Sequence, residues 1–192
     1  MITGIVLAAG MGSRFGGDKM LHLIKHEDGT DIPMGLLSAL NLKPWVDQII
    51  CVVRPQDEAL IKLYKQHGFN IHKSENYQQG LSASLIAGVQ ASHNASAWVV
   101  ALGDMPFIKS SSYEKIKKGL AATLNNKIVV LTYNNKPGHP VAFPQRLKNN
   151  LLGLQGDVGA RSIVLSEGEN IVSLEAADKG IHLDIDYRLD ED

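Results

Sequence analysis

An apolar run leads into a loop rich in glycine in the stretch Ile2-Thr3-Gly4-Ile5-Val6-Leu7-Ala8-Ala9-Gly10-Met11-Gly12-Ser13-Arg14-Phe15-Gly16-Gly17-Asp18-Lys19. A continuous apolar, β-branched run is typical of a strand buried in a parallel sheet. In open α/β sheets, ligands bind beyond the carboxyl ends of the strands, where this loop would lie. Small residues let backbone N–H groups approach a phosphate closely, and Arg14 and Lys19 add positive charge. The segment therefore indicates an α/β fold with an anion site after its first strand.

Further apolar runs alternate with helical patterns along the chain. Strands are expected at residues 2–8, 47–53, 69–72, 97–102 and 127–133, and helices at 34–42, 56–67, 81–92 and 111–124. Gly68 would end the second helix, and Ser111-Ser112-Tyr113-Glu114 would start the fourth as a capping box. Strands that alternate with helices predict a three-layer α/β/α sandwich with a mostly parallel sheet and right-handed crossovers.

The pattern is less regular from residue 134 onward. Short strands are expected at 139–144, 171–174 and 181–185, and helices at 145–152 and 158–166. The polar segment at 26–33 is expected to be a surface turn. Because no internal repeat and no linker interrupts the pattern, the 192 residues are predicted to form a single domain.

Composition excludes several classes of protein. The formal net charge is -1, from 19 Lys plus Arg and 20 Asp plus Glu, so the chain has no overall attraction to nucleic acid or anionic membranes. The single cysteine, Cys51, excludes an intrachain disulfide framework and a cysteine metal cluster. The apolar N-terminal run lacks the basic residues and the length of a signal peptide, and no run reaches the roughly 18 apolar residues of a membrane helix. A cytoplasmic location is expected.

Two familiar glycine motifs fit the loop poorly. A Rossmann fingerprint needs G-x-G-x-x-G, but one residue too many separates Gly12 from Gly16. A P-loop needs G-x-x-x-x-G-K-[ST]. Gly12 and Gly17 have that spacing, but Asp18 precedes the lysine and Met20 replaces the hydroxyl residue. A tight turn without a ligand is the plainer alternative, although such a turn does not need four glycines, an arginine and a lysine.

Aspartates occur at the ends of two expected strands. Asp104 lies in the run Ala101-Leu102-Gly103-Asp104-Met105-Pro106, at the carboxyl end of a buried strand. A carboxylate there suits Mg²⁺ held between protein and phosphates, and a turn cap is the plainer alternative. Asp184 and Asp186 would point to the same face of a strand, because side chains alternate with a period of two residues.

The loop pattern Leu7-Ala8-Ala9-Gly10-x-Gly12-Ser13-Arg14-Phe15-Gly16, with Lys19, resembles the signature of the MobA-like NTP transferases. Ala8-Ala9 at its start resembles the molybdenum cofactor cytidylyltransferase branch, and UTP, dTTP and ATP stay open as alternative substrates. The resemblance covers Ile2 to Asp186 and implies a Rossmann-like fold of the nucleotide-diphospho-sugar transferase type. It implies that the loop wraps a triphosphate, and that Lys19, Arg14 and Asp104 are the catalytic residues.

A second segment, Tyr77-Gln78-Gln79-Gly80-Leu81-Ser82-Ala83-Ser84-Leu85, matches the nucleotide pocket of the family. Gly80 would let the backbone approach a planar base, and the hydroxyls of Ser82 and Ser84 would contact base or ribose. A plain helix cap by Ser82 is the alternative. The resemblance thus implies nucleotide contacts for Leu7, Ala8, Ala9, Gly10, Gly12, Ser13, Arg14, Lys19, Gly80, Ser82, Ser84 and Asp104. It implies Mg²⁺ ligation by Asp104 and Asp186, although Tyr187-Arg188 replaces the Thr-Pro of the family.

Two further motifs match the branch: Pro137-Gly138-His139-Pro140-Val141-Ala142-Phe143 and Gly156-Asp157-Val158-Gly159-Ala160-Arg161. The resemblance places Gly138 and His139 on the acceptor side, where Arg161 would bind an anionic acceptor. From the residues alone, His139 fits a packed or turn position as well. Arg161 fits an ion pair with Asp157, four residues earlier on a helix.

The implied reaction transfers CMP from CTP to the molybdopterin form of the molybdenum cofactor, with Mg²⁺ as cofactor and pyrophosphate as leaving group. Residues at about 1–107 would bind the nucleotide, and those at about 108–192 the acceptor. A molybdoenzyme or its chaperone would be the protein partner, and neither nucleic acid nor a membrane is expected. Two alternatives stay open: a nucleotidyltransferase that acts on a sugar phosphate or another phosphorylated small molecule, and a catalytically silent nucleotide- or cofactor-binding chaperone.

Overall fold

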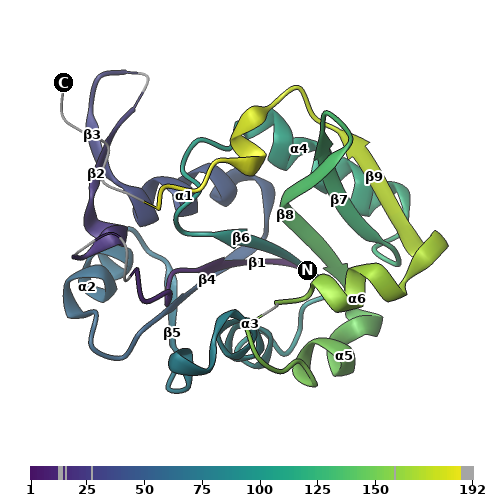
Figure 1. Cartoon of the computed structure of the whole chain (residues 1–192), viewed down its shortest axis with the longest axis horizontal. Helices are drawn as coiled ribbons and strands as arrows, with labels where there is room; N and C mark the ends of the chain where they lie inside the picture. Colours follow the sequence, from purple (N-terminus) through teal and green to yellow (C-terminus); the bar gives the residue numbers. More distant parts are fainter. Residues whose placement is uncertain (13–14, 16, 27, 158, 187–192) are drawn as a thin grey trace.

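The computed structural model describes residues 1–12, 15, 17–26, 28–157 and 159–186 of the chain (Figure 1). Within these residues, one sheet has seven strands in the order β5-β4-β1-β6-β8-β7-β9. The strands are β1 (Ile2–Leu7), β4 (Gln48–Val53), β5 (Asn70–Lys73), β6 (Ala97–Leu102), β7 (Ile128–Tyr133), β8 (Lys136–Pro144) and β9 (Ile171–Glu175). The expected strands at the corresponding runs are confirmed to within a few residues.

The sheet is mixed, with β8 running against its neighbours. β1 pairs in parallel with both β4 and β6, so that Leu7 lies opposite Val52 and Leu102. β8 is antiparallel to β6 and β7, and β9 is parallel to β7. The central strands are apolar without alternation because both of their faces are buried.

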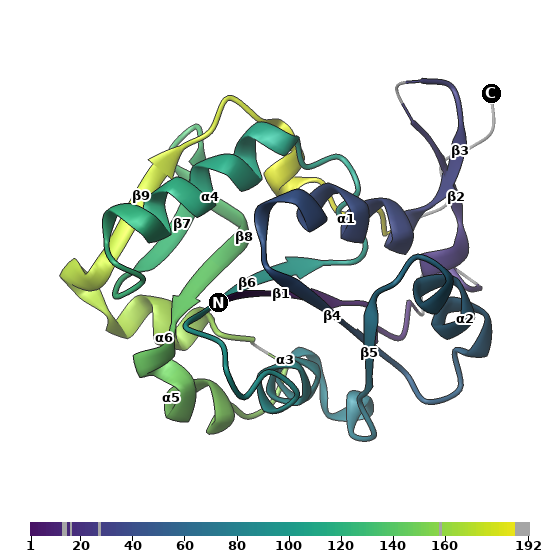
Figure 2. The same cartoon turned by 180° about the vertical axis from the view of Figure 1, so that it is seen from behind.

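Helices cover the two faces of the sheet in separate groups (Figures 1 and 2). α1 (Met34–Leu42), α2 (Glu58–Gln66) and α4 (Ser110–Ala122) share one apolar core, to which Leu36, Leu60 and Ile116 belong. α3 (Leu81–Gln90), α5 (Lys148–Leu152) and α6 (Arg161–Ser166) share a second core on the other face, with Leu85, Leu151 and Ile163. The expected three-layer α/β/α sandwich is confirmed. No helix in the described part of the chain is long and apolar enough to span a membrane.

A small hairpin projects from the sandwich, and its second strand falls within the segment 26–33 that is expected to be a surface turn (Figure 1). Its strands, β2 (Leu23–Lys25) and β3 (Asp31–Pro33), pair antiparallel. Ile24 belongs to a third apolar cluster with Phe15, Met34 and Ile185. Only the middle residue of β2 is buried, and an alternation of polar and apolar residues over three positions does not distinguish a strand from a turn.

The expected strand at 181–185 is wrong. The chain there forms a short 3-10 helix, Lys179–His182, followed by an irregular segment up to Asp186. The carboxylate of Asp178, only 2% exposed, accepts hydrogen bonds from the Gly180 and Lys109 amides and the Ser112 hydroxyl. The bonds from Lys109 and Ser112 hold the segment against the start of α4, and the bond from Gly180 closes the turn within the segment.

Asp178 also explains why the expected capping box is wrong. α4 begins at Ser110 without a side-chain cap from its own N-terminal residues, and Ser112 donates to Asp178 instead. The Lys109 amide donates to a carboxylate that lies 69 residues away in the chain. The first amides of a helix need partners from outside the helix, so α4 obtains one from the segment that leads to Asp186.

Replacing Asp178 with alanine should lower the free energy of unfolding by about 1–3 kcal/mol, because buried donors are left without an acceptor. Chemical denaturation followed by circular dichroism measures the loss. Asp178→Asn keeps one carbonyl acceptor and should lose less. Equal stability of the wild type and the alanine variant would contradict the anchoring role.

Candidate active site

The loop after β1 and the turn after β6 lie side by side because their strands are neighbours. The Ala8 amide donates to Val52 O at 2.8 Å, and the Gly103 amide donates to Leu7 O at 2.9 Å. The pairing of the strands therefore continues past their carboxyl ends. Asp104 follows directly, so its side chain begins at the edge where the glycine loop leaves the sheet.

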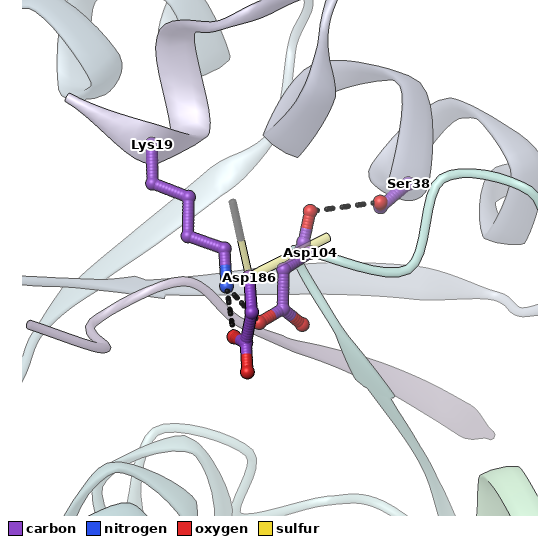
Figure 3. Close-up of polar contacts among 5 residues, drawn as sticks. Lys19, Ser38, Asp104 and Asp186 are labelled. Atoms are coloured by element: carbon purple, nitrogen blue, oxygen red, sulfur yellow. Dashed lines mark hydrogen bonds and ion pairs between the residues drawn. The ribbon is translucent and has the colours of Figure 1, made fainter. Parts of the chain in front are cut away.

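The ammonium of Lys19 joins two carboxylates at this edge (Figure 3). Its Nζ lies 2.8 Å from Asp104 Oδ2 and 3.1 Å from Asp186 Oδ1, and these residues stand 85 and 167 positions away in the chain. The Lys19 side chain is 8% exposed, whereas those of Asp104 and Asp186 are 22% and 39% exposed. A buried cation thus holds together two carboxylates that reach solvent.

Backbone contacts hold Asp104 in place. The Ser38 hydroxyl on α1 donates to Gly103 O at 2.9 Å (Figure 3), and the Ile185 amide donates to Asp104 O at 3.0 Å. A Cβ at Gly103 would lie 2.9 Å from the sulfur of Met20. Glycine therefore allows the 3-10 helix Lys19–Leu21, which carries the lysine, to pack directly on this turn.

Opposing effects act on the pKa of Lys19. Burial of the ammonium lowers the pKa, but hydrogen bonds and charge attraction from Asp104, followed by those from Asp186, outweigh burial. The pKa is raised above the ordinary value of 10.5. Lys19 is therefore positively charged at neutral pH and offers that charge to an anion bound beside it.

The carboxylates of the cluster fit a hard divalent cation. Mg²⁺ in proteins binds through one or two carboxylates and keeps water or substrate phosphates as its other ligands. Asp104 and Asp186 are two such carboxylates gathered around one positive charge. The described residues contain no group of three or more His, Cys, Asp or Glu side chains placed for a metal. A metal bound here would take its other ligands from substrate or solvent.

A cavity of about 450 Å³, which we call the loop cavity, opens beside this cluster. The expected nucleotide-binding residues in its lining are Leu7, Ala9, Gly10, Gly12, Gly80, Ser84 and Asp104. Gly12 has a φ of +55°, and a Cβ there would lie 3.3 Å from the Cβ of Lys19. The left-handed backbone favours glycine and brings the loop close to the lysine stem.

Other expected nucleotide-binding residues lie elsewhere. Ala8 is buried in the apolar core beneath the loop. Ser82 is 1% exposed inside α3, with its hydroxyl 3.5 Å from Gln155 O, and it lines a separate cavity. Gly80, rather than Ser82, is the N-cap residue of α3. Ser13 and Arg14 lie outside the described residues.

A second cavity, of about 460 Å³, adjoins the first, because Leu7, Leu81 and Leu102 line both. We call it the apolar cavity, since most of its lining is aliphatic or aromatic. The expected acceptor-binding residues, Gly138, His139 and Arg161, all lie in its lining.

His139 and Arg161 are the polar side chains of the apolar cavity. The Nδ1 atom of His139 is buried and has no hydrogen-bond partner among the described residues, and burial lowers the pKa of the ring. The ring is therefore neutral at neutral pH. Arg161 is the first residue of α6, so the helical spacing assumed for an ion pair with Asp157 is absent.

Sequence reasoning missed the contact between Gly80 and Asp157. The Leu81 amide donates to Asp157 Oδ1 at 2.8 Å, and a Cβ at Gly80 would lie 2.6 Å from the same oxygen. Gly80 thus makes room for this carboxylate. Gly138 similarly makes room for the backbone of Ile181, because a Cβ at position 138 would lie 2.5 Å from Ile181 O. No local pattern reveals such contacts, because the partners are far apart in the chain.

The family model for the MobA-like NTP transferase domain matches residues 4–171, which include the glycine loop, Asp104 and the lining of both cavities. This chain belongs to that family. Asp186 lies beyond the matched residues of the MobA-like domain. Among characterised relatives, nicotine blue oxidoreductase from Paenarthrobacter nicotinovorans is 23% identical, over 98% of this chain and 96% of the relative.

Solved structures share the fold of this MobA-like domain. Rv0371c from Mycobacterium tuberculosis H37Rv is 26% identical with a TM-score of 0.77, over 97% of this chain and 92% of that one. A second structure of Rv0371c, in complex with manganese, has a TM-score of 0.71 and 25% identity over 91% of this chain and 88% of that one. A nucleotidyl transferase from Methanothermobacter has a TM-score of 0.79 and 20% identity, over 97% of this chain and 92% of that one. The expected nucleotidyltransferase type of fold is confirmed.

Gly80→Ala should lower the free energy of unfolding by more than Gly29→Ala does. Both glycines have positive φ, +100° and +85°, so each variant carries a backbone cost of about 1–3 kcal/mol. Only the Cβ at position 80 also overlaps Asp157, whereas nothing lies within 4 Å of one at Gly29. Urea titrations of the two variants measure the difference, and equal losses would contradict the contact.

Asp104→Asn should lower the pKa of Lys19, because it removes the partner with the larger raising effect. An NMR titration of the lysine ammonium measures the shift, and Asp31→Asn on the hairpin is the control. Since the folded state raises this pKa, the contribution of the Lys19 charge to stability is fully present just below pH 10.5 and is lost as the pH rises through the folded-state pKa. An unaltered Lys19 pKa in Asp104→Asn would contradict the coupling.

Proposed function

We propose that this protein transfers CMP from CTP to the molybdopterin form of the molybdenum cofactor and releases pyrophosphate. The observation that carries the proposal is the Lys19 bridge between Asp104 and Asp186, beside two adjoining cavities. A metal-bound triphosphate needs positive charge and metal-binding carboxylates within one site, and the cluster supplies both. Membership of the MobA-like family supports nucleotidyl transfer.

The triphosphate would lie along the loop from Gly10 to Gly12, where backbone N–H groups approach its oxygens without side chains in the way. Lys19 would offset the negative charge that develops on the leaving pyrophosphate. Arg14, placed by the sequence in the same loop, would add a second positive charge.

The acceptor would occupy the apolar cavity, with its ring system against the aliphatic lining. The buried Nδ1 of His139 would hydrogen-bond the ring system, and Arg161 would bind an anionic group. Residues at about 1–107 would thus bind the nucleotide, and those at about 108–192 the acceptor, within a single domain.

The reaction needs little covalent work from the protein. A phosphate oxygen of the acceptor attacks the α-phosphorus in line, and the bond from this phosphorus to the oxygen that bridges to the β-phosphate breaks. A phosphate monoester is already ionised at neutral pH, so no general base is required. The adjoining cavities would contribute by holding attacking and leaving groups in line.

Asp104 and Asp186 would hold Mg²⁺, which when bound supplies Lewis-acid polarisation of the phosphate oxygens. The manganese bound in a structure of Rv0371c supports a divalent cation in this family. The cytoplasmic location expected from the sequence stays a prediction.

A pyrophosphate-release assay tests the proposal. The protein is incubated with Mg²⁺ and each nucleoside triphosphate in turn, together with molybdopterin or a sugar phosphate. Turnover that requires CTP and the pterin supports the proposal, whereas turnover with a sugar phosphate favours the alternative acceptor. Nucleotide binding without pyrophosphate favours a cofactor chaperone. Because one relative is named an oxidoreductase, a parallel assay of NADH and NADPH oxidation is included, and activity there without pyrophosphate release would contradict the proposal.

Asp104→Ala should reduce pyrophosphate release by at least about a hundredfold, because loss of a metal ligand removes several kcal/mol of transition-state stabilisation. The fold should persist, since the Asp104 side chain lies at an edge that solvent reaches. Steady-state rates and circular dichroism measure the two properties, with Asp31→Ala as the matched control. A fully active Asp104→Ala enzyme would overturn the role of this carboxylate.

A further inference from the structure

The loop cavity carries a carboxylate that the proposed mechanism does not use, Asp157, which comes from the part of the chain otherwise assigned to the acceptor. Asp157 lines it together with Gln78, Gln79 and Gly80 from the turn before α3. The triphosphate is assigned to the Gly10–Gly12 loop and Lys19, where positive charge lies. A further carboxylate repels phosphate, so the part of the lining around Asp157 suits the base rather than the phosphates.

The described residues hold one oxygen of Asp157 in place and supply no partner to the other. Oδ1 accepts a hydrogen bond from the Leu81 amide at the start of α3 at 2.8 Å, across 76 positions of sequence. Gly80, which has no Cβ, allows this approach. No other hydrogen bond or ion pair of Asp157 is present among the described residues. An ionised carboxylate is an acceptor only, so its remaining lone pairs select for a donor on the ligand.

The bases differ in what they offer to such an acceptor. Cytosine has an exocyclic amino group that donates, whereas uracil has a carbonyl oxygen at the same position, and a carboxylate repels that oxygen. We propose that Asp157 determines base specificity by accepting a hydrogen bond from the amino group of cytosine and rejecting uracil. This inference rests on the proposed use of a nucleoside triphosphate and names the residue that makes the choice.

A purely structural role for Asp157 would have a different signature. If the carboxylate only connected its loop to α3, its loss would weaken every nucleotide alike. If it reads the base, its loss alters the ratio of CTP to UTP binding. Asp157→Asn separates the two roles, because the amide oxygen still accepts from the Leu81 amide while the amide nitrogen presents a donor to the base.

The experiment measures dissociation constants of CTP and UTP by calorimetry, each with Mg²⁺, for wild type, Asp157→Asn and the control Asp31→Asn. We expect the wild type to bind CTP at least about tenfold more tightly than UTP, the usual effect of one specific base contact. In Asp157→Asn this preference should fall by at least about tenfold or invert, and in Asp31→Asn it should persist. Thermal melting checks that each variant is folded.

Three results would overturn the inference while leaving nucleotidyl transfer intact. They are a wild type that does not prefer CTP, an unchanged ratio in Asp157→Asn, and an equal loss of affinity for both nucleotides in that variant. A wild-type protein that binds no nucleoside triphosphate would instead overturn the proposed function, and this inference with it.

Discussion

The site depends on one buried ammonium between two carboxylates. Lys19 comes from the loop after β1, Asp104 from the turn after β6, and Asp186 from a segment near the other end of the chain. Without the lysine, two neighbouring carboxylates would repel each other, and without the carboxylates a largely buried ammonium would lack compensation for desolvation. The surrounding contacts serve this arrangement, because Ser38 supports the β6 turn and Asp178 anchors the segment that carries Asp186.

Most of the sandwich could be predicted from the sequence because its signals are local. The apolar runs of β1, β4 and β6 show burial on both faces, and helices with one apolar side occupy the intervals between them. The segment after Asp178 could not be predicted in this way. Its apolar residues resemble a strand, but a carboxylate bonded to α4 determines its path. The hairpin at 23–33 is likewise too short for its periodicity to show.

The candidate site was predictable to the extent that it follows from strand order. A glycine loop after the first strand and an aspartate after a neighbouring parallel strand must meet at one edge of the sheet. Ser82 shows the limit of such reasoning, since Gly80 is the N-cap residue of α3 and the serine, two positions later, is buried within the helix. Asp157 shows another limit. Its carboxylate accepts a hydrogen bond from the Leu81 amide, 76 positions earlier in the chain, and fits there because Gly80 has no Cβ. Neither fact can be read from the local sequence.

The position of Asp186 has a consequence for the order in which the protein matures. The cluster joins residues separated by 167 positions, and chains emerge from the ribosome with their N-terminal parts first. The strands and helices of the sandwich are all complete by Glu175, before this carboxylate has been synthesised. The sheet, the glycine loop and Asp104 can therefore be in place before the second carboxylate docks on Lys19. The contact between Lys19 and Asp186 is thus the part of the cluster that depends on the segment after the last strand.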